Sequence, residues 1–232
     1  MGFWQVTMRR SVRLSRTYFI LGIVMTVYGI ILSNIMSIIP SGSVTPAPID
    51  LSYNFPVLSV ALLSLSAVLF SLPVVMLFVY DKNNGVLEYL LSTGLDQLDI
   101  FKGYVKASLA LAMYLLVFAI ILNTVVGVLL GTSLSLLASM AVLTFAISIS
   151  EVFLVSVCMV AFSSFQKTPM GANQPLGVIV GVIPMLPALI LPIVFPAFAI
   201  TVDLSIAAIM LIASLALLLS VDRLILREKL LP

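Results

Sequence analysis

The chain has no histidine and only one cysteine, Cys158. A base built on histidine is therefore excluded, and so is a metal site built on histidine and cysteine, the side chains that most zinc sites use. A disulfide within the chain is also excluded, and Cys158, which stands in an apolar run, is most simply a small core residue. The patterns HExxH, GxSxG and GxxxxGK(S/T) are missing, so the sequence indicates no catalytic residues and no phosphate loop for ATP on this chain.

Charge is scarce as well. Only 9% of the 232 residues are charged, whereas a soluble domain carries about 25%. Hydrophobic residues make up 62% of the chain, and its mean hydropathy is +1.28. So few charges cannot cover a water-facing surface, and no polar stretch is long enough for a soluble domain. We therefore predict an all-α integral membrane protein with a single transmembrane domain over residues 1–232.

Residues 1–16 predict a helix with an apolar side and a basic side. The apolar side carries Phe3, Trp4, Met8, Val12 and Leu14, and the basic side carries Arg9, Arg10, Arg13 and Arg16. Such a helix lies in the membrane interface, with its tryptophan at the headgroup level and its arginines toward anionic lipid. A signal peptide is the alternative, but the next apolar run is too long for one and no small-residue cleavage site follows.

Several later runs are apolar enough to cross a bilayer, which takes about 20 residues in a helix. We predict six transmembrane helices, at about residues 17–39, 56–80, 107–130, 134–162, 175–192 and 204–221. A loop rich in Pro and Ser at 41–55 separates the first two, and Pro73 is expected to kink the second. The prolines of the fifth run predict that this helix breaks, with a re-entrant or interfacial segment at 193–200.

The eleven basic residues predict the orientation of the chain. Six spans place both termini on the same side of the membrane. All eleven bases lie in the N-terminal segment, between the second and third spans, between the fourth and fifth, or in the tail. Because basic segments remain on the cytoplasmic side, we predict a multi-pass protein of the cell membrane with both termini cytoplasmic.

The stretch 81–106 holds four of the nine acidic residues and keeps a helical period. Its apolar side is formed by Val86, Leu87, Leu90, Leu91, Leu95, Leu98 and Phe101, and its polar side by Glu88, Ser92, Asp96 and Asp99. Asn83-Asn84-Gly85 predicts a turn before the helix, and Gly94 predicts a second break. The spacing favours one or two short amphipathic helices against the inner membrane surface over the alternative, a polar loop.

Three polar residues within spans are candidates for a translocation pathway: Glu151, Asn123 and Ser66. Glu151 stands near mid-bilayer, where an ionised acid is costly, so it is expected to be protonated, paired or facing a cavity. It could contact a substrate or a proton, or it could simply be hydrogen-bonded to a neighbour such as a serine of the second span. Asn123 is as readily explained by helix packing.

The layout resembles the membrane subunit of an ABC transporter, in particular the type-2 exporter permease family. An amphipathic elbow helix precedes six spans, and a charged amphipathic segment links the second and third. In the family this segment has an acidic residue, then Gly followed by Thr/Val-Leu-Glu-x-Leu-Leu, and later Gly-Lys. The matching positions here are Asp81, Gly85-Val86-Leu87-Glu88-Tyr89-Leu90-Leu91 and Gly103-Tyr104. Two positions differ from the family pattern: Gly94 stands where the family often has Pro, and Tyr104 stands where it often has Lys.

The resemblance implies an exporter subunit for a hydrophobic or amphipathic substrate. A separate ATP-binding subunit would hold ATP and Mg²⁺, a second permease subunit, identical or different, would complete the pathway, and lipid would surround it. No cofactor on this chain and no nucleic acid is implied. The coupling helix would contact the ATPase through Glu88, Leu91, Asp96, Leu98, Asp99, Phe101 and Lys102.

Two other functions fit the same topology. The chain could be a membrane anchor or assembly subunit of a larger complex, with no transport and no partner ATPase. It could also be a secondary transporter driven by protons through Glu151, although the sequence shows no inverted repeat.

Overall fold

A computed structural model describes residues 2–14, 16–38, 51–162, 186, 190 and 198–224. Within these residues the regular structure is helical throughout, without a strand, which confirms the predicted all-α fold for this part of the chain. The helices are α1 (Phe3–Leu14), α2 (Arg16–Ile38), α3 (Leu51–Asn83), α4 (Val86–Ser92), α5 (Gln97–Leu129), α6 (Leu134–Phe162) and α9 (Ala199–Leu224).

Three of the described helices are long and apolar enough to cross a membrane, which takes about 20 residues. These segments are Val60–Asn83 of α3, Gln97–Leu129 of α5 and Leu134–Cys158 of α6. The α1–α2 pair, bent by 85°, adds a fourth if its two helices count as one broken span. The described part of α9 contributes a shorter apolar helix, Thr201–Leu217. The described chain thus has the helices of a multi-pass membrane protein.

The helix bounds differ from the expected spans at several places. α6 has the expected bounds of the fourth span, whereas α5 begins at Gln97, so the end of the charged stretch and the third span form one helix. Residues 51–55, expected in a loop, belong to α3, which continues as one helix through Pro73. The fifth span, apart from residues 186 and 190, and most of the segment 193–200 lie outside the described residues.

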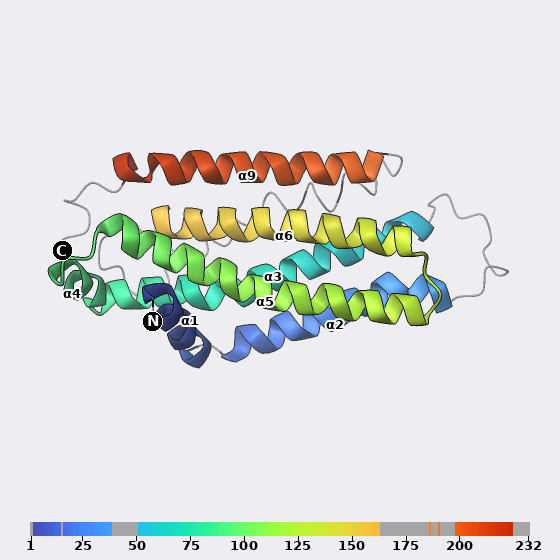
Figure 1. Cartoon of the computed structure of the whole chain (residues 1–232), viewed down its shortest axis with the longest axis horizontal. Helices are drawn as coiled ribbons and strands as arrows, with labels where there is room; N and C mark the ends of the chain where they lie inside the picture. Colours follow the sequence, from blue (N-terminus) through green and yellow to red (C-terminus); the bar gives the residue numbers. More distant parts are fainter. Residues whose placement is uncertain are drawn as a thin grey trace.

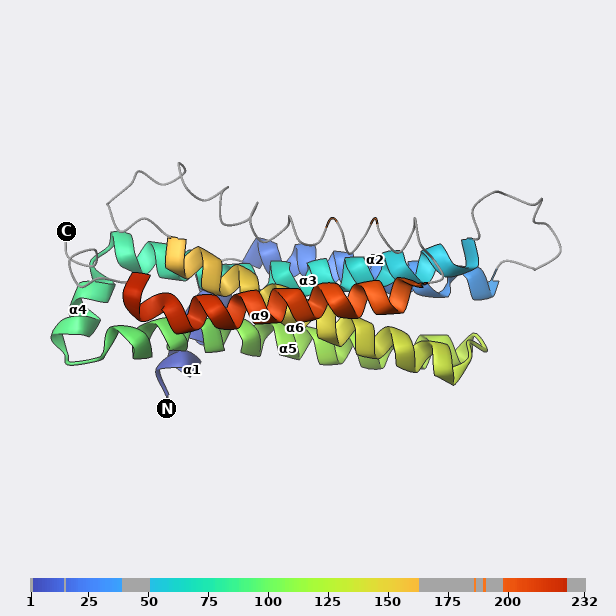
Figure 2. The same cartoon turned by 90° about the horizontal axis from the view of Figure 1, so that it is seen from above.

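The long helices form an elongated bundle with α4 at one end (Figure 1). α3 packs against α2, α5 and α6, while α9 packs along α6, and α1 crosses α3 and α5 near the α4 end. Figure 2 shows the same bundle from above, with α9 running along α6 over most of its length.

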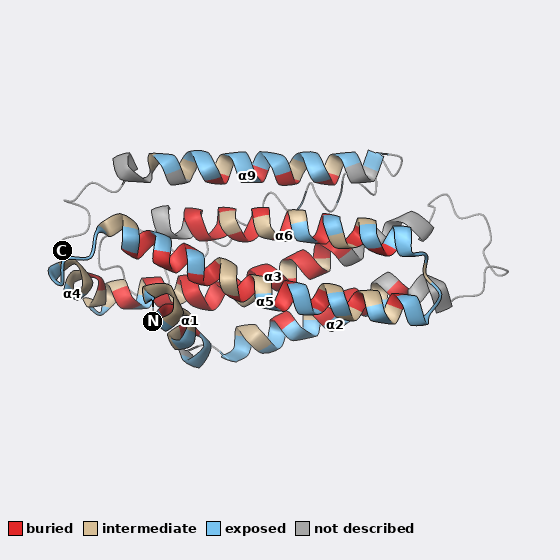
Figure 3. Cartoon of the chain, in the orientation of Figure 1, coloured by how far each residue is buried: buried red, intermediate tan, exposed pale blue. Residues whose placement is uncertain are grey.

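Burial follows this arrangement. Buried residues gather along α3, on the inner side of α6 and on the first half of α5, whereas the outer sides of α2 and α9 are exposed (Figure 3). Large apolar side chains stand on the outer sides of the helices, among them Tyr28 of α2 (61% exposed), Tyr114 of α5 (67%) and Ile209 of α9 (66%). An apolar outer surface of this extent is expected where the surroundings are lipid rather than water.

Candidate functional site: a braced surface at one end of the bundle

Two glycines shape the end of the bundle. Gly85 (φ 71°) separates α3 from α4, and Gly94 (φ 88°) lies in the turn between α4 and α5. Side chains other than glycine rarely adopt a φ in this range, so each glycine allows a reversal that other residues would resist. The predicted turn at residues 83–85 and the predicted break at Gly94 are confirmed, and together they bring the chain back so that α5 starts beside the end of α3.

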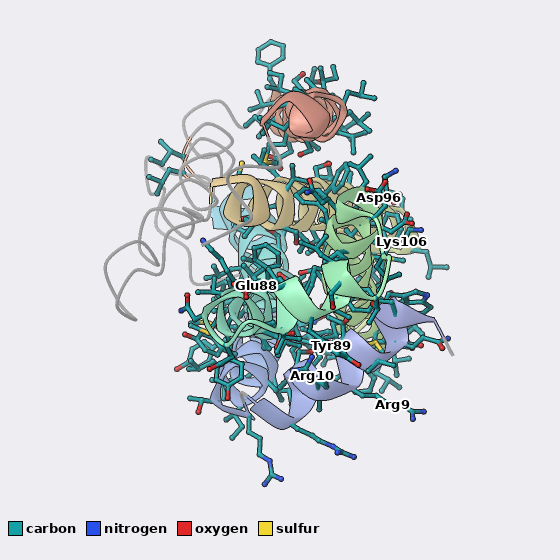
Figure 4. All side chains as sticks on the ribbon, turned by 90° about the vertical axis from the view of Figure 1, so that its left-hand side faces the viewer. Arg9, Arg10, Glu88, Tyr89, Asp96 and Lys106 are labelled. Atoms are coloured by element: carbon teal, nitrogen blue, oxygen red, sulfur yellow. The ribbon has the colours of Figure 1, made fainter. Side chains whose placement is uncertain are left out.

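The turn of chain between α3 and α5 presents a surface that combines acidic and apolar groups. We call it the end surface, and it consists of Glu88, Tyr89, Ser92, Thr93, Leu95, Asp96 and Asp99. Tyr89 is 67% exposed and Leu95 is 37% exposed, while Asp96 and Asp99 are exposed and Glu88 is half-buried. Figure 4 shows Glu88, Tyr89 and Asp96 on the end that faces the viewer. The charged side chains of this set are all acidic, and the exposed Lys102 follows Asp99 on α5.

The end surface is supported by a core directly beneath it. Leu87 (5% exposed), Ile100 (5%) and Phe101 (2%) are buried in one cluster with residues of the last turns of α3, including Leu77 and Phe78. The short α4 is therefore held against α3 and α5 by apolar contacts rather than extending freely from the bundle.

The predicted coupling residues are not all available to a partner. Glu88, Asp96, Asp99 and Lys102 reach the surface, and Leu91 and Leu98 are half-buried against the core cluster. Phe101, which the resemblance placed among the contact residues, is 2% exposed and packs inside the cluster. It can support the end surface but cannot reach another protein without a rearrangement.

A buried carboxylate connects α1 to this end of the bundle. Asp81, near the end of α3, is fully buried and accepts hydrogen bonds from both terminal nitrogens of Arg10, at 2.6 and 2.9 Å. The hydroxyl of Tyr104 on α5 donates a third bond to Asp81, at 2.6 Å. A carboxylate held by a bidentate guanidinium and a phenol is among the stronger polar arrangements in proteins.

Aromatic rings pack around this carboxylate. The ring of Tyr104 meets Phe3 of α1 edge-on, with 5.6 Å between ring centroids, and meets Phe78 of α3 in the same way at 5.0 Å. Gly103 lies under Phe3, and a Cβ there would collide with the ring. α1 is thus packed directly on the backbone of α5.

The structure corrects the expected orientation of α1. All four arginines were expected on its outer side, but Arg10 points inward to Asp81, whereas Arg9 and Arg13 are exposed. Thr7 (2% exposed) and Ser11 (0%) are buried, because their hydroxyls are satisfied by carbonyl oxygens of their own helix. The buried side of α1 is therefore a mixture of rings and small hydroxyl side chains.

Glu151 lies in the interior of the bundle and is fully buried. The hydroxyl of Ser64 in α3 donates a hydrogen bond of 2.5 Å to its Oε2, and its Oε1 has no hydrogen-bond partner among the described residues. The arrangement matches the simpler of the two expectations for Glu151, a hydrogen bond to a serine of the second span. The other half of the carboxyl group is available to a further polar group.

The three pathway candidates are not joined into one site by the contacts of the described residues. Asn34 of α2 donates to Asn123 of α5 at 3.1 Å, which links those two helices. Ser66 donates to the carbonyl of Leu63 in its own helix. Only the Asn34–Asn123 contact joins two helices, as polar side chains often do in membranes, whereas the Ser66 bond stays within α3.

Two buried acids, Asp81 and Asp203, have little signal in the sequence. Asp81 appeared only as a member of a motif, because its partner Arg10 is 71 positions away along the chain. Asp203, one residue before the predicted start of the last span, lies in α9 and is 1% exposed. An isolated acid beside a long apolar run was the only sequence signal for Asp203.

In the described part of the chain no group of three or more Cys, Asp or Glu side chains could hold a metal ion. The end surface is acidic and partly apolar, and the buried cluster beneath it packs α4 against α3 and α5. No family model matches the chain, and no curated protein or solved structure matches it.

Proposed function

We propose that the chain is the permease subunit of an ATP-driven transporter, and that a separate ATP-hydrolysing subunit binds the end surface. One observation carries this proposal: Tyr89 is 67% exposed, whereas Leu87, two residues earlier in the same short helix, is 5% exposed within the core. A surface that transmits movement has to meet its partner and be firmly attached to the moving helices at the same time. α4 has both properties.

The chemistry of the surface defines the partner. Glu88, Asp96 and Asp99 lie on the same end of the bundle as the exposed side chains of Tyr89 and Leu95. A groove with an apolar floor and a basic rim is the complement of such a surface, because opposite charges at the edge orient the partner while an aromatic side chain supplies buried area. ATP and Mg²⁺ are held by that partner in this proposal, and the chain itself carries out no catalytic step.

The proposal includes a layout that goes beyond the described helices. It has six spans, α1 as an interfacial elbow helix, α4 as a coupling helix in the cytoplasm, a re-entrant segment before the last span, and both termini cytoplasmic in the cell membrane. The cytoplasmic position of α4 is supported by the basic residues of α1, by Lys82 at the end of α3, and by Lys102 and Lys106 at the start of α5. All of these lie toward the same end of the bundle as α4. Basic residues are expected on the cytoplasmic side.

The pathway in this proposal lies between two permease subunits, identical or different, and exports a hydrophobic or amphipathic substrate. The largely apolar helices of the described chain support a substrate of that class. Glu151 supplies a polar contact inside the bundle, because one of its carboxyl oxygens has no hydrogen-bond partner among the described residues.

Reversing two charges of the end surface tests the docking site. The double variant E88K/D96K is expected to lower the ATP-hydrolysing activity that copurifies in mild detergent by about tenfold or more, since like charges facing each other in an interface cost several kcal/mol. The chain should remain folded, because Glu88 is only half-buried and Asp96 is exposed.

The matched control is Lys106→Glu, which reverses an exposed charge on α5 outside the end surface. It should leave the copurified activity unchanged. If E88K/D96K retained as much ATP-hydrolysing activity as the unaltered chain, the end surface would not be the docking site.

Glu151 also favours a second candidate, a proton-driven transporter, because a fully buried acid with one unpartnered oxygen among the described residues can bind a proton. Such a transporter would move its substrate in sealed vesicles under a pH gradient with no nucleotide present. A non-transporting anchor subunit would neither capture an ATPase nor move substrate. Transport that depends on ATP and on the captured subunit separates the first proposal from both.

A further inference from the structure

We infer that Arg10, Asp81 and Tyr104 are positioning residues that fix α1 to the base of the end surface, so that α1 and α4 move as one body. The importance of this link for transport rests on the proposed function. The link itself rests only on the contacts of the described residues, and it can be tested without any partner.

The link begins with the position of Asp81. Asp81 lies two residues before the end of α3 and four before Gly85, the reversal into α4. Its carboxylate is the point where three helices meet, since it accepts bonds from Arg10 of α1 and from Tyr104 of α5. A shift of α4 that moves the last turn of α3 therefore moves the group to which α1 is attached.

The contact is specific in its geometry. Arg10 approaches with two nitrogens in the fork arrangement that matches a carboxylate, which fixes the angle between the two side chains as well as their distance. Asp81 has no exposed surface, so water cannot replace either partner without opening the packing. Arg10 retains 42% exposure, so the link lies at the rim of the bundle rather than in its centre.

Contacts with the bundle decide where α1 lies. The axes of α1 and α2 differ by 85° across a single residue, so continuity with α2 does not align α1 with the bundle. It is held by the Arg10–Asp81 pair, by the packing of Phe3 on Tyr104 and Gly103, and by Trp4 and Met8, which pack against the same core cluster. In Figure 4, Arg9 and Arg10 are drawn on α1, below the labelled Glu88 and Tyr89 of α4 in that view. A movement of the end surface would therefore be transmitted to α1, whose outer side carries the exposed Arg9 and Arg13.

Distances between spin labels test the link. The only cysteine, Cys158, can be replaced (C158A), and labels can be placed at the exposed positions Val12 of α1 and Ser92 of α4. We expect one narrow distance distribution in the otherwise unaltered chain. The double variant R10M/D81N removes both charges together, so no buried charge is left unpaired, and it should broaden this distribution into several populations.

Three further measurements make the result decisive. Labels at Tyr114 and Ile209, exposed on α5 and α9, should keep the same distance in every variant that is folded. Arg9→Ala, next to Arg10 on the exposed side of α1, should leave the Val12–Ser92 distribution narrow. Arg10→Lys, which keeps the charge but not the two parallel hydrogen bonds, should give a distribution between those of the unaltered chain and of R10M/D81N, a partial rescue that a purely space-filling role would not give.

A narrow Val12–Ser92 distribution in R10M/D81N would overturn the inference. If that variant also broadens the Tyr114–Ile209 distances, it has lost its fold, and Arg10→Gln decides instead, because it removes both guanidinium hydrogen bonds to Asp81 and keeps the hydroxyl bond from Tyr104. Broadening confined to the Val12–Ser92 pair then supports the link, and no change in either pair overturns it. A confirmed link in a chain that captures no ATPase would leave the inference standing and refute the proposed function alone.

Discussion

Replacing Arg10 with alanine should lower the free energy of unfolding by about 3 kcal/mol. Loss of one partner from a buried ion pair costs about 3–5 kcal/mol because the other charge remains buried without compensation. The lower value applies here because Arg10 is 42% exposed, so that solvent already screens part of the attraction, whereas Asp81 is fully buried. The loss can be measured by denaturant titration of the purified protein in detergent.

Two variants show that this effect comes from the unpaired carboxylate. Arg9→Ala removes an exposed charge from the same helix and should change stability by no more than about 0.5 kcal/mol. R10M/D81N removes both charges and should recover most of the loss, since neutral groups of similar shape often replace a buried pair at little cost. Equal losses for Arg10→Ala and Arg9→Ala would show that the pair contributes nothing.

Replacing Phe101 with alanine should destabilise the protein by about 3–5 kcal/mol, the usual cost of removing a buried aromatic ring. Phe101 is 2% exposed and belongs to the cluster that supports α4. The resulting cavity should also loosen the end surface, so capture of the ATP-hydrolysing subunit should fall together with stability. Thermal unfolding in detergent and copurified ATPase activity measure the two effects.

Asp99, two residues earlier on the exposed side of the same helix, provides the comparison. Asp99→Ala should leave thermal unfolding nearly unchanged, within about 0.5 kcal/mol, and weaken only capture. A stable Phe101→Ala protein that fails to bind the partner would instead make Phe101 a contact residue, as the family resemblance implied.

The local features of the fold were the most predictable. The bounds of the fourth span and the breaks at Gly85 and Gly94 follow from residue type, because a long apolar run continues as a helix and glycine interrupts it. The start of α5 was not predictable in this way. Charged side chains at 96–106 suggested a separate interfacial helix, yet Lys102 and Lys106 project from the same helix that buries Tyr104.

The candidate site was predicted in its location but not in the roles of its residues. A helical period shows which residues share a side, but it does not show what each side packs against. Phe101 and Leu95 belong to the same apolar set, yet one is 2% exposed and the other 37%. The pairing of Arg10 with Asp81 depends on a contact across 71 residues, which no local pattern contains.

The most direct test of the central claim is a photo-crosslinking residue introduced at Tyr89, compared with the same residue at Tyr114. Both positions are 67% exposed, but Tyr89 lies on the end surface and Tyr114 on the outer side of α5. We expect illumination of the ATP-hydrolysing complex to join the chain to its nucleotide-binding subunit from position 89 and not from position 114. A complex that hydrolyses ATP but gives no such product at position 89, or gives it equally at both positions, would contradict the account.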